Sequence, residues 1–216
     1  MTIHSDKTIL AFGDSLTWGF EAGTFRRHPL EYRWPTALER ELGPGHRVIA
    51  EGMNGRTTVY DDPTVPENRN GAAVLPTLLS THQPLDLVII MLGTNDVKFA
   101  GRCRAFDAAR GMNRLVQMVQ DFRYNADYAT PKVLVVAPPH AVKTTNRFFA
   151  DLFEHAIEET KLFALHYGAL AEELGVGFFD AATVAKADPT DGVHLDRANT
   201  AALGRALAGP VRTLLA

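Results

Sequence analysis

The sequence predicts a three-layer α/β fold in which helices cover both faces of a five-stranded, mostly parallel sheet. Three observations support this fold class. Five short apolar runs alternate with segments of helical spacing, as right-handed crossovers between parallel strands require. The runs are apolar throughout rather than at every second residue, which indicates burial on both faces. The 216 residues provide one sizeable core but are few for two ordinary domains, so we expect a single domain over residues 1–216.

The five apolar runs are the expected strands. They contain mainly β-branched and other aliphatic side chains, together with phenylalanines, and each is short enough to be one strand of a buried sheet. In chain order they are TILAF (8–12), RVIAE (47–51), DLVIIML (86–92), KVLVVA (132–137) and VGFFD (176–180).

Four segments carry apolar residues at helical spacing. The first, WPTALEREL (34–42), has Pro35 near its start and Gly43 directly after its end, which is the usual helix punctuation. The second covers 106–122, and the third covers 147–174 as one long helix that stops at Gly175. The fourth closes the chain over 196–215.

Composition and charge exclude several classes of protein. A net charge of −3, with 46% hydrophobic and 22% charged residues, is typical of a soluble globular protein and lacks the basic face of a nucleic-acid binder. The longest apolar run, residues 87–92, is far shorter than a membrane span, and the N-terminus has no signal-peptide pattern. The one cysteine, Cys103, cannot form an internal disulfide. We therefore expect a cytoplasmic protein with neither a nucleic-acid nor a membrane partner.

Unusual polar residues follow the predicted strands. In parallel sheets, ligands bind outside the carboxyl ends of the strands, so these loops are the expected functional edge. They are GDSLTWG with Ser15, GMNGRTT with Asn54 and Gly55, GTND with Asn95, and DPTDGVHLD with Asp191 and His194.

These residue types suit acyl transfer. A serine hydroxyl needs a base to take its proton, and the imidazole of a histidine suits that task when a carboxylate orients it. We therefore expect Ser15 to be the nucleophile, His194 the base and Asp191 the residue that orients it. The oxyanion donors are then the backbone N–H groups of Ser15 and Gly55 and the side-chain amide of Asn95. The sequence has no metal-binding motif, and we expect neither a metal nor a cofactor.

Three further residues are candidates for substrate binding. Trp18, three residues after the nucleophile, is expected to form the wall of the acyl pocket, which favours acetate over long acyl groups. Asn54 precedes the predicted donor Gly55. Phe153 belongs to a group of phenylalanines at helical spacing (148, 149 and 153), which is more typical of a core, although we expect at least one to line the alcohol side.

The four polar loops also resemble a known family. FGDSL, the Gly55 block, GTND and DGVH resemble the four blocks of the SGNH (GDSL-type) hydrolases, and the similarity runs from Lys7 to near the C-terminus. GDSLTWG, QPLDLVIIMLGTND and PKVLVVAPP are most similar to the bacterial arylesterase/acyltransferase group, whose members also perform perhydrolysis. The resemblance implies a flavodoxin-like fold, activity on short-chain acyl esters and assembly into homo-oligomers.

The expected function is that of a serine esterase and acyltransferase acting on small acetyl esters, such as aryl esters. Its acyl-enzyme would react with water, with another alcohol, or with hydrogen peroxide in perhydrolysis. Two alternatives remain open. One is a carbohydrate acetyl esterase, which needs a more open and polar cleft. The other is a non-catalytic flavodoxin-like module that binds a ligand at the same strand ends.

Overall fold

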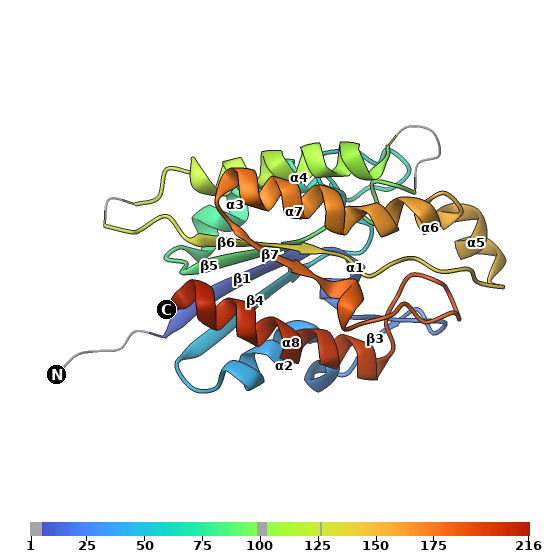
Figure 1. The fold of residues 1–216 in the computed structure, drawn as a ribbon, viewed down its shortest axis with the longest axis horizontal. Helices are drawn as coiled ribbons and strands as arrows, with labels where there is room; N and C mark the ends of the chain where they lie inside the picture. Colours follow the sequence, from blue (N-terminus) through green and yellow to red (C-terminus); the bar gives the residue numbers. More distant parts are fainter. Residues whose placement is uncertain (1–5, 99–102, 126) are drawn as a thin grey trace.

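The five predicted strands form one parallel sheet in the order β4-β1-β5-β6-β7 (Figure 1). This structure is a computed structural model, and it describes residues 6–98, 103–125 and 127–216. The predicted fold class is confirmed, and each strand lies within a residue or two of its predicted bounds. The strands are β1 (Lys7–Gly13), β4 (His46–Gly52), β5 (Leu87–Met91), β6 (Lys132–Ala137) and β7 (Gly177–Asp180).

Helices cover both faces of the sheet (Figure 1). On one face, α2 and α8 pack against each other, and Trp34 and Leu207 join a buried cluster with Ile9 and Ile89 of the sheet. On the other face, α3, α4 and α7 cover a second buried cluster. The bounds of these helices are α2 (Trp34–Leu42), α3 (Gly71–His82), α4 (Ala105–Gln120), α7 (Phe163–Leu174) and α8 (Arg197–Leu215).

Shorter elements lie mainly in the loops. A short hairpin, in which β2 and β3 have two residues each, follows α1. The 3₁₀ turns η1 and η2 precede α2 and α7, and η3 directly follows β7. Within the described residues, every helix is too short or too polar to span a bilayer. The short elements are α1 (Ser15–Trp18), β2 (Phe20–Glu21), β3 (Arg26–Arg27), η1 (Leu30–Tyr32), α5 (Arg147–Phe153), α6 (Ala156–Glu159), η2 (Thr160–Leu162) and η3 (Ala181–Thr183).

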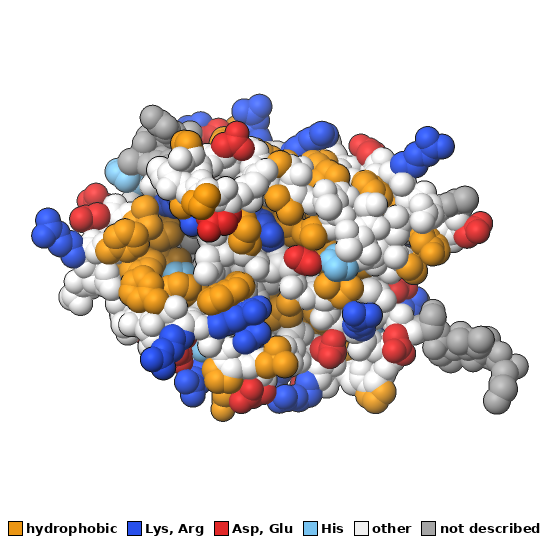
Figure 2. All heavy atoms as spheres, turned by 180° about the vertical axis from the view of Figure 1, so that it is seen from behind, with side chains coloured by type: hydrophobic (Ala, Val, Ile, Leu, Met, Phe, Trp, Pro, Cys, Tyr) orange, Lys and Arg blue, Asp and Glu red, His pale blue; other side chains and the backbone are white. Residues whose placement is uncertain are grey.

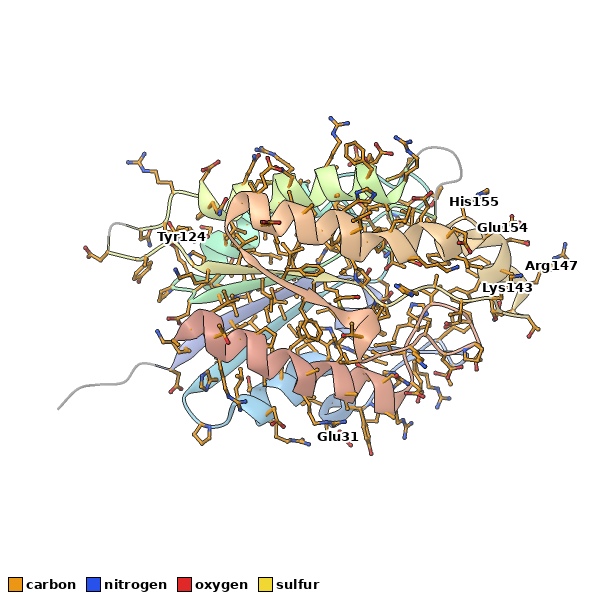
Figure 3. All side chains as sticks on the ribbon, viewed as in Figure 1. Glu31, Tyr124, Lys143, Arg147, Glu154 and His155 are labelled. Carbon is orange, nitrogen blue, oxygen red and sulfur yellow. The ribbon has the colours of Figure 1, made fainter. Side chains whose placement is uncertain are left out.

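The predicted long helix over 147–174 is wrong, because the structure divides it into α5, α6, η2 and α7. Glu154 and His155 lie at the first break (Figure 3), and α5 turns away from the line of α6 and α7 there (Figure 1). At the second interruption, in η2, the Thr160 hydroxyl donates to the Ala156 carbonyl and accepts from the Ala141 amide. Such side-chain bonds compete with the helical ladder and bend it. The first break, between α5 and α6, allows phenylalanines of α5 to reach the strand-end loops.

Helix α3 is absent from the sequence prediction. Its first nine residues, GAAVLPTLL, are nearly all apolar, so they show no contrast between a polar and an apolar face. Pro76 inside the segment also argues against a helix. The Asn70 side chain caps the helix by accepting from the Ala73 amide, which is a start signal that the sequence does contain.

Candidate active site

Ser15, His194 and Asp191 form a continuous hydrogen-bonded row at the carboxyl edge of the sheet. His194 Nε2 lies 3.0 Å from Ser15 Oγ, and His194 Nδ1 lies 2.8 Å from Asp191 Oδ2. All three side chains are buried. Ser15 and His194 are 179 residues apart in the chain, so the fold itself brings these three predicted residues together.

The sharp turn after β1 presents Ser15. Ser15 is the first residue of α1, and the preceding Asp14 caps this short helix by accepting from the Leu16 amide at 3.0 Å. Because the first N–H groups of a helix have no intrahelical acceptor, the Ser15 N–H remains able to donate to a ligand. This geometry places the hydroxyl and the backbone N–H of one residue at the same site.

Asp191 organises the loop that carries His194. Its Oδ1 accepts the backbone N–H groups of Val193 at 3.0 Å and His194 at 2.9 Å, while Oδ2 faces the imidazole. Burial alone would raise the pKa of Asp191, but these hydrogen bonds and the nearby imidazole hold that pKa below its usual value. Gly192 adopts a φ of +79°, and a Cβ there would lie 2.3 Å from the Val142 carbonyl oxygen, so the turn requires glycine.

Gly55 and Asn95 lie beside Ser15 in the same cavity. The Asn95 amide donates to the Arg56 carbonyl at 3.1 Å and to Asp14 Oδ2 at 3.3 Å, which fixes its orientation. Gly55 adopts a φ of +79°, and a Cβ there would lie 2.6 Å from Cζ of Arg69. The three predicted oxyanion donors are therefore gathered around one site.

Two buried carboxyl groups brace the loops behind these donors. Asp96 accepts the backbone N–H of Thr58 at 3.1 Å and also the Thr58 hydroxyl. Burial raises the pKa of Asp96 to about 7, although the bonds from Thr58 lower it. Burial likewise raises the pKa of Asp14 to about 6. Ionisation of either carboxyl group therefore lowers the free energy of unfolding.

Replacing Asp96 with asparagine is expected to weaken the pH dependence of stability. The folded pKa of about 7 exceeds the ordinary 3.8, so the unfolded chain loses this proton first as pH rises. The stability that the group contributes is present below about pH 4 and is lost as pH rises through about 7. Between these limits the free energy of unfolding should fall less in Asp96→Asn than in the wild type, by about 2–4 kcal/mol. Urea unfolding at several pH values measures this difference.

The matched control is Asp151→Asn, which neutralises an exposed carboxylate on α5. Its stability curve should run parallel to that of the wild type. Parallel curves for Asp96→Asn as well would contradict the prediction.

A cavity of about 210 Å³ opens above Ser15 and His194. Asn54 and Phe153, both predicted from the sequence, line it. Trp18 is not among the lining side chains. The Arg27 guanidinium instead lies 4.9 Å from the Trp18 ring centre, and Arg27 Nε donates to the Trp18 carbonyl. The lining residues are Ser15, Phe20, Phe25, Asn54, Gly55, Arg69, Asn95, Lys98, Phe148, Phe149, Leu152, Phe153 and His194.

Two aromatic rings contact His194, and the sequence prediction missed Phe20, whereas Phe149 belongs to the group of phenylalanines of which at least one was expected to line the alcohol side. Phe20 stacks on the imidazole at 4.1 Å between ring centres, and Phe149 meets it edge-on at 5.6 Å. Hydrophobic side chains gather around a hollow at the left of Figure 2. The triplet of phenylalanines at 148, 149 and 153 was the available signal for Phe149. Phe20 gave none, because only the β2–β3 hairpin brings its ring to His194.

Two other candidate features lie apart from this chemistry. Burial raises the pKa of the Cys103 thiol to about 12, which disfavours the reactive thiolate. In the part of the chain that the structure describes, no group of three or more His, Cys, Asp or Glu side chains is arranged to hold a metal ion.

Comparison with known proteins relates the chain to one family. The sequence model of the GDSL-like Lipase/Acylhydrolase family matches residues 11–200. No curated protein matches the chain.

Solved structures resemble the chain over nearly its full length. A carbohydrate acetylesterase family member from Sinorhizobium meliloti is 48% identical, with a TM-score of 0.94 over 97% of this chain and 99% of that one. The aryl esterase of M. smegmatis is 46% identical, with a TM-score of 0.92 over 97% and 100%. Est24, a carbohydrate acetylesterase from Sinorhizobium meliloti, is 40% identical, with a TM-score of 0.93 over 97% and 100%.

Proposed function

We propose, from the premise that this chain belongs to the GDSL-like lipase/acylhydrolase family, that it is a serine esterase for small acetyl esters with Ser15, His194 and Asp191 as its catalytic triad. One observation carries the proposal. The hydrogen-bonded row from Ser15 Oγ through both imidazole nitrogens to Asp191 Oδ2, at 3.0 and 2.8 Å, has the donor and acceptor order that nucleophilic catalysis requires.

The first half of the reaction forms an acyl-enzyme. His194 Nε2 takes the Ser15 proton as Oγ attacks the ester carbonyl, and Asp191 stabilises the resulting imidazolium through Nδ1. The carbonyl oxygen becomes an oxyanion that accepts hydrogen bonds from the Ser15 and Gly55 N–H groups, and from the Asn95 amide once its Nδ2 releases the longer, 3.3 Å bond to Asp14. The C–O bond to the alcohol then breaks, and the alcohol leaves with the proton from His194.

The second half releases the acyl group. His194 takes a proton from the acceptor, whose oxygen attacks the acyl carbon, and Ser15 recovers its proton as the serine ester bond breaks. Water as acceptor gives a carboxylic acid, an alcohol gives a new ester, and hydrogen peroxide gives a peracid. We include the last two as side activities, since the aromatic lining of the cavity disfavours bulk water and so favours other acceptors.

The aromatic lining supports aryl esters as substrates. The two rings that contact His194 flank the atom that protonates the leaving alcohol, and an aryl group can stack there. A carbohydrate acetyl esterase is the second candidate, because two of the similar structures are described as carbohydrate acetylesterases. Comparing phenyl acetate with an acetylated xylose or glucose separates the two functions.

Labelling by an organophosphate tests the proposal directly. Paraoxon should add one diethyl phosphoryl group to Ser15, detectable by intact mass and peptide mapping, and should abolish hydrolysis of phenyl acetate in proportion to labelling. An unlabelled protein that nonetheless cleaves phenyl acetate would refute the serine mechanism. A protein that is neither labelled nor active would favour the non-catalytic ligand-binding module.

Acyl chain length should strongly affect the rate. The cavity of about 210 Å³ must hold both halves of the ester, so a long acyl chain finds too little room beside the aryl group and must displace lining side chains. We expect kcat/KM for 4-nitrophenyl octanoate to fall about 100-fold below that for the acetate, with the butyrate between them. A release assay at 400 nm measures all three, and equal rates would contradict the expectation.

We further propose that copies of this chain associate. Phe25 and Phe148 are 64% and 63% exposed at the mouth of the cavity and both pack against Phe149, and an exposed aromatic cluster favours a protein partner. Sedimentation should then reveal a species heavier than the 23.7 kDa chain. A monomer at micromolar concentration would contradict this assembly.

A further inference from the structure

Two cationic side chains, Arg69 and Lys98, line the cavity that holds Ser15 and His194. We call this pair the cationic wall. In the described part of the chain, none of the lining residues is Asp or Glu. The proposed cleavage of a neutral acetyl ester assigns no task to these two charges.

The Asp62 carboxylate pairs with both members of the cationic wall. Asp62 Oδ2 accepts from Arg69 Nη1 at 2.9 Å and from Lys98 Nζ at 3.2 Å. The side chains of Asp62 and Lys98 are only 2% and 6% exposed, so this is a built cluster rather than a pair of solvated surface charges. Both cations of the cluster line the cavity, whereas Asp62 does not, so the cluster presents its positive groups to the cavity.

Arg69 retains an unused donor. Its Nε is buried, and within the described residues it has no hydrogen-bond partner. A buried donor without an acceptor is costly, and an anionic ligand would satisfy it. Guanidinium groups are well suited to carboxylate and phosphate ligands.

The position of the wall indicates which half of the substrate meets it. The alcohol must lie beside His194, where Phe20 and Phe149 pack, because His194 protonates it. The carbonyl oxygen must lie beside Gly55 and Asn95. The Arg69 guanidinium occupies the space beside Gly55 that a Cβ would enter, so the wall adjoins the acyl half.

We propose that Arg69 and Lys98 select esters whose acyl group ends in an anion, such as monoesters of short dicarboxylic acids, over neutral acyl groups of the same size. The inference rests on the proposed esterase function and names a substrate class for the same site. The acyl carboxylate would face the cationic wall, while its ester carbonyl faces the oxyanion donors.

The test compares two esters of equal size. Ethyl hydrogen succinate carries a terminal carboxylate, and ethyl levulinate carries a methyl ketone in the same place. For the wild type, we expect kcat/KM for the succinate ester to exceed that for the levulinate ester by about tenfold or more. Release of ethanol, followed by NMR at pH 7.5, gives both values. A ratio of one or less overturns the proposal.

Variants then assign the preference to the wall. Lys98→Met and Arg69→Met keep much of each side chain's length and remove its charge, and each should lower the ratio by about tenfold. Lys132→Met should leave the ratio unchanged. It removes a charge at the first residue of β6, at the amino ends of the strands and so away from the cavity. A ratio that stays at its wild-type value in both wall variants overturns the proposal.

Two measurements on the wild type keep the test independent of folding defects. Raising sodium chloride to about 0.5 M should lower the ratio through screening. The second measurement compares 4-acetoxybenzoate with 4-acetoxyacetophenone. These two esters also differ by a carboxylate against a methyl ketone, but on the alcohol half of the ester. A larger charge preference with this pair than with the succinate pair would place the anion on the alcohol side and overturn the proposal.

Failure of this inference is distinguishable from failure of the proposed function. If the protein cleaves 4-acetoxyacetophenone and Ser15→Ala does not, the esterase function stands whatever the charge ratio. A ratio of one then refutes only the anionic-acyl preference. If neutral and anionic esters are all cleaved equally by Ser15→Ala and the wild type, the proposed function and this inference both fail.

Discussion

Ser15→Ala is expected to lower kcat for phenyl acetate by about 10⁴- to 10⁶-fold while KM changes little. The substitution removes Oγ, which lies 3.0 Å from His194 Nε2, so neither the nucleophile nor its proton remains. The backbone N–H of residue 15 stays in place, as do Gly55 and Asn95, and these donors would support the residual rate. Release of phenol over a range of phenyl acetate concentrations up to saturation measures the loss in kcat and any change in KM.

The matched control for this prediction is Ser80→Ala. Ser80 is exposed on α3, and its hydroxyl has no role in the site, so its kinetics should equal those of the wild type. Circular dichroism should show that both variants are folded. A folded Ser15→Ala protein that retains more than about a tenth of the wild-type kcat would exclude Ser15 as the nucleophile.

The sheet and the polar loops could be predicted because each depends on local sequence. The run LVIIM of β5 is fully buried, and such a run is recognisable by its unbroken apolar character. The order of strands along the chain then places Ser15, Asn95 and His194 at one edge, since all carboxyl ends of a parallel sheet lie together. Chain order alone therefore locates the proposed chemistry.

The lining of the cavity depends on tertiary packing and was much less predictable. Arg69 and Lys98 meet through Asp62, and the pairing is invisible in a sequence that separates Asp62 from Lys98 by 36 residues. Trp18 has the spacing of a pocket wall, but the Arg27 guanidinium packs against its ring, and Phe20 lines the cavity instead. Phe149 reaches the site only because the predicted long helix breaks after α5.

Asp191→Asn is expected to lower kcat by about 10⁴-fold with little change in fold. The amide oxygen can still accept the backbone N–H groups of Val193 and His194, which lie 3.0 and 2.9 Å from Oδ1, so the loop keeps its shape. The amide NH₂ would then face His194 Nδ1 and donate to it. That bond requires the imidazole proton to sit on Nε2, where it points at Ser15 and cannot be exchanged for the Ser15 proton.

The control for Asp191→Asn comes from the same loop. Asp188 accepts the Thr190 amide through its Oδ1 and has no side-chain bond to His194, so Asp188→Asn makes the same chemical change without touching the imidazole. Its kcat for phenyl acetate should remain near that of the wild type. Paraoxon should label Asp188→Asn as fast as the wild type and should label Asp191→Asn much more slowly, because its Ser15 is less activated. If Asp191→Asn lost less than about tenfold in kcat, the carboxylate would be holding the loop rather than selecting the tautomer of His194. One Asp191 oxygen accepts from the backbone and the other faces the imidazole. Asp191→Asn keeps the first contact and changes the second, so it separates holding the loop from orienting His194.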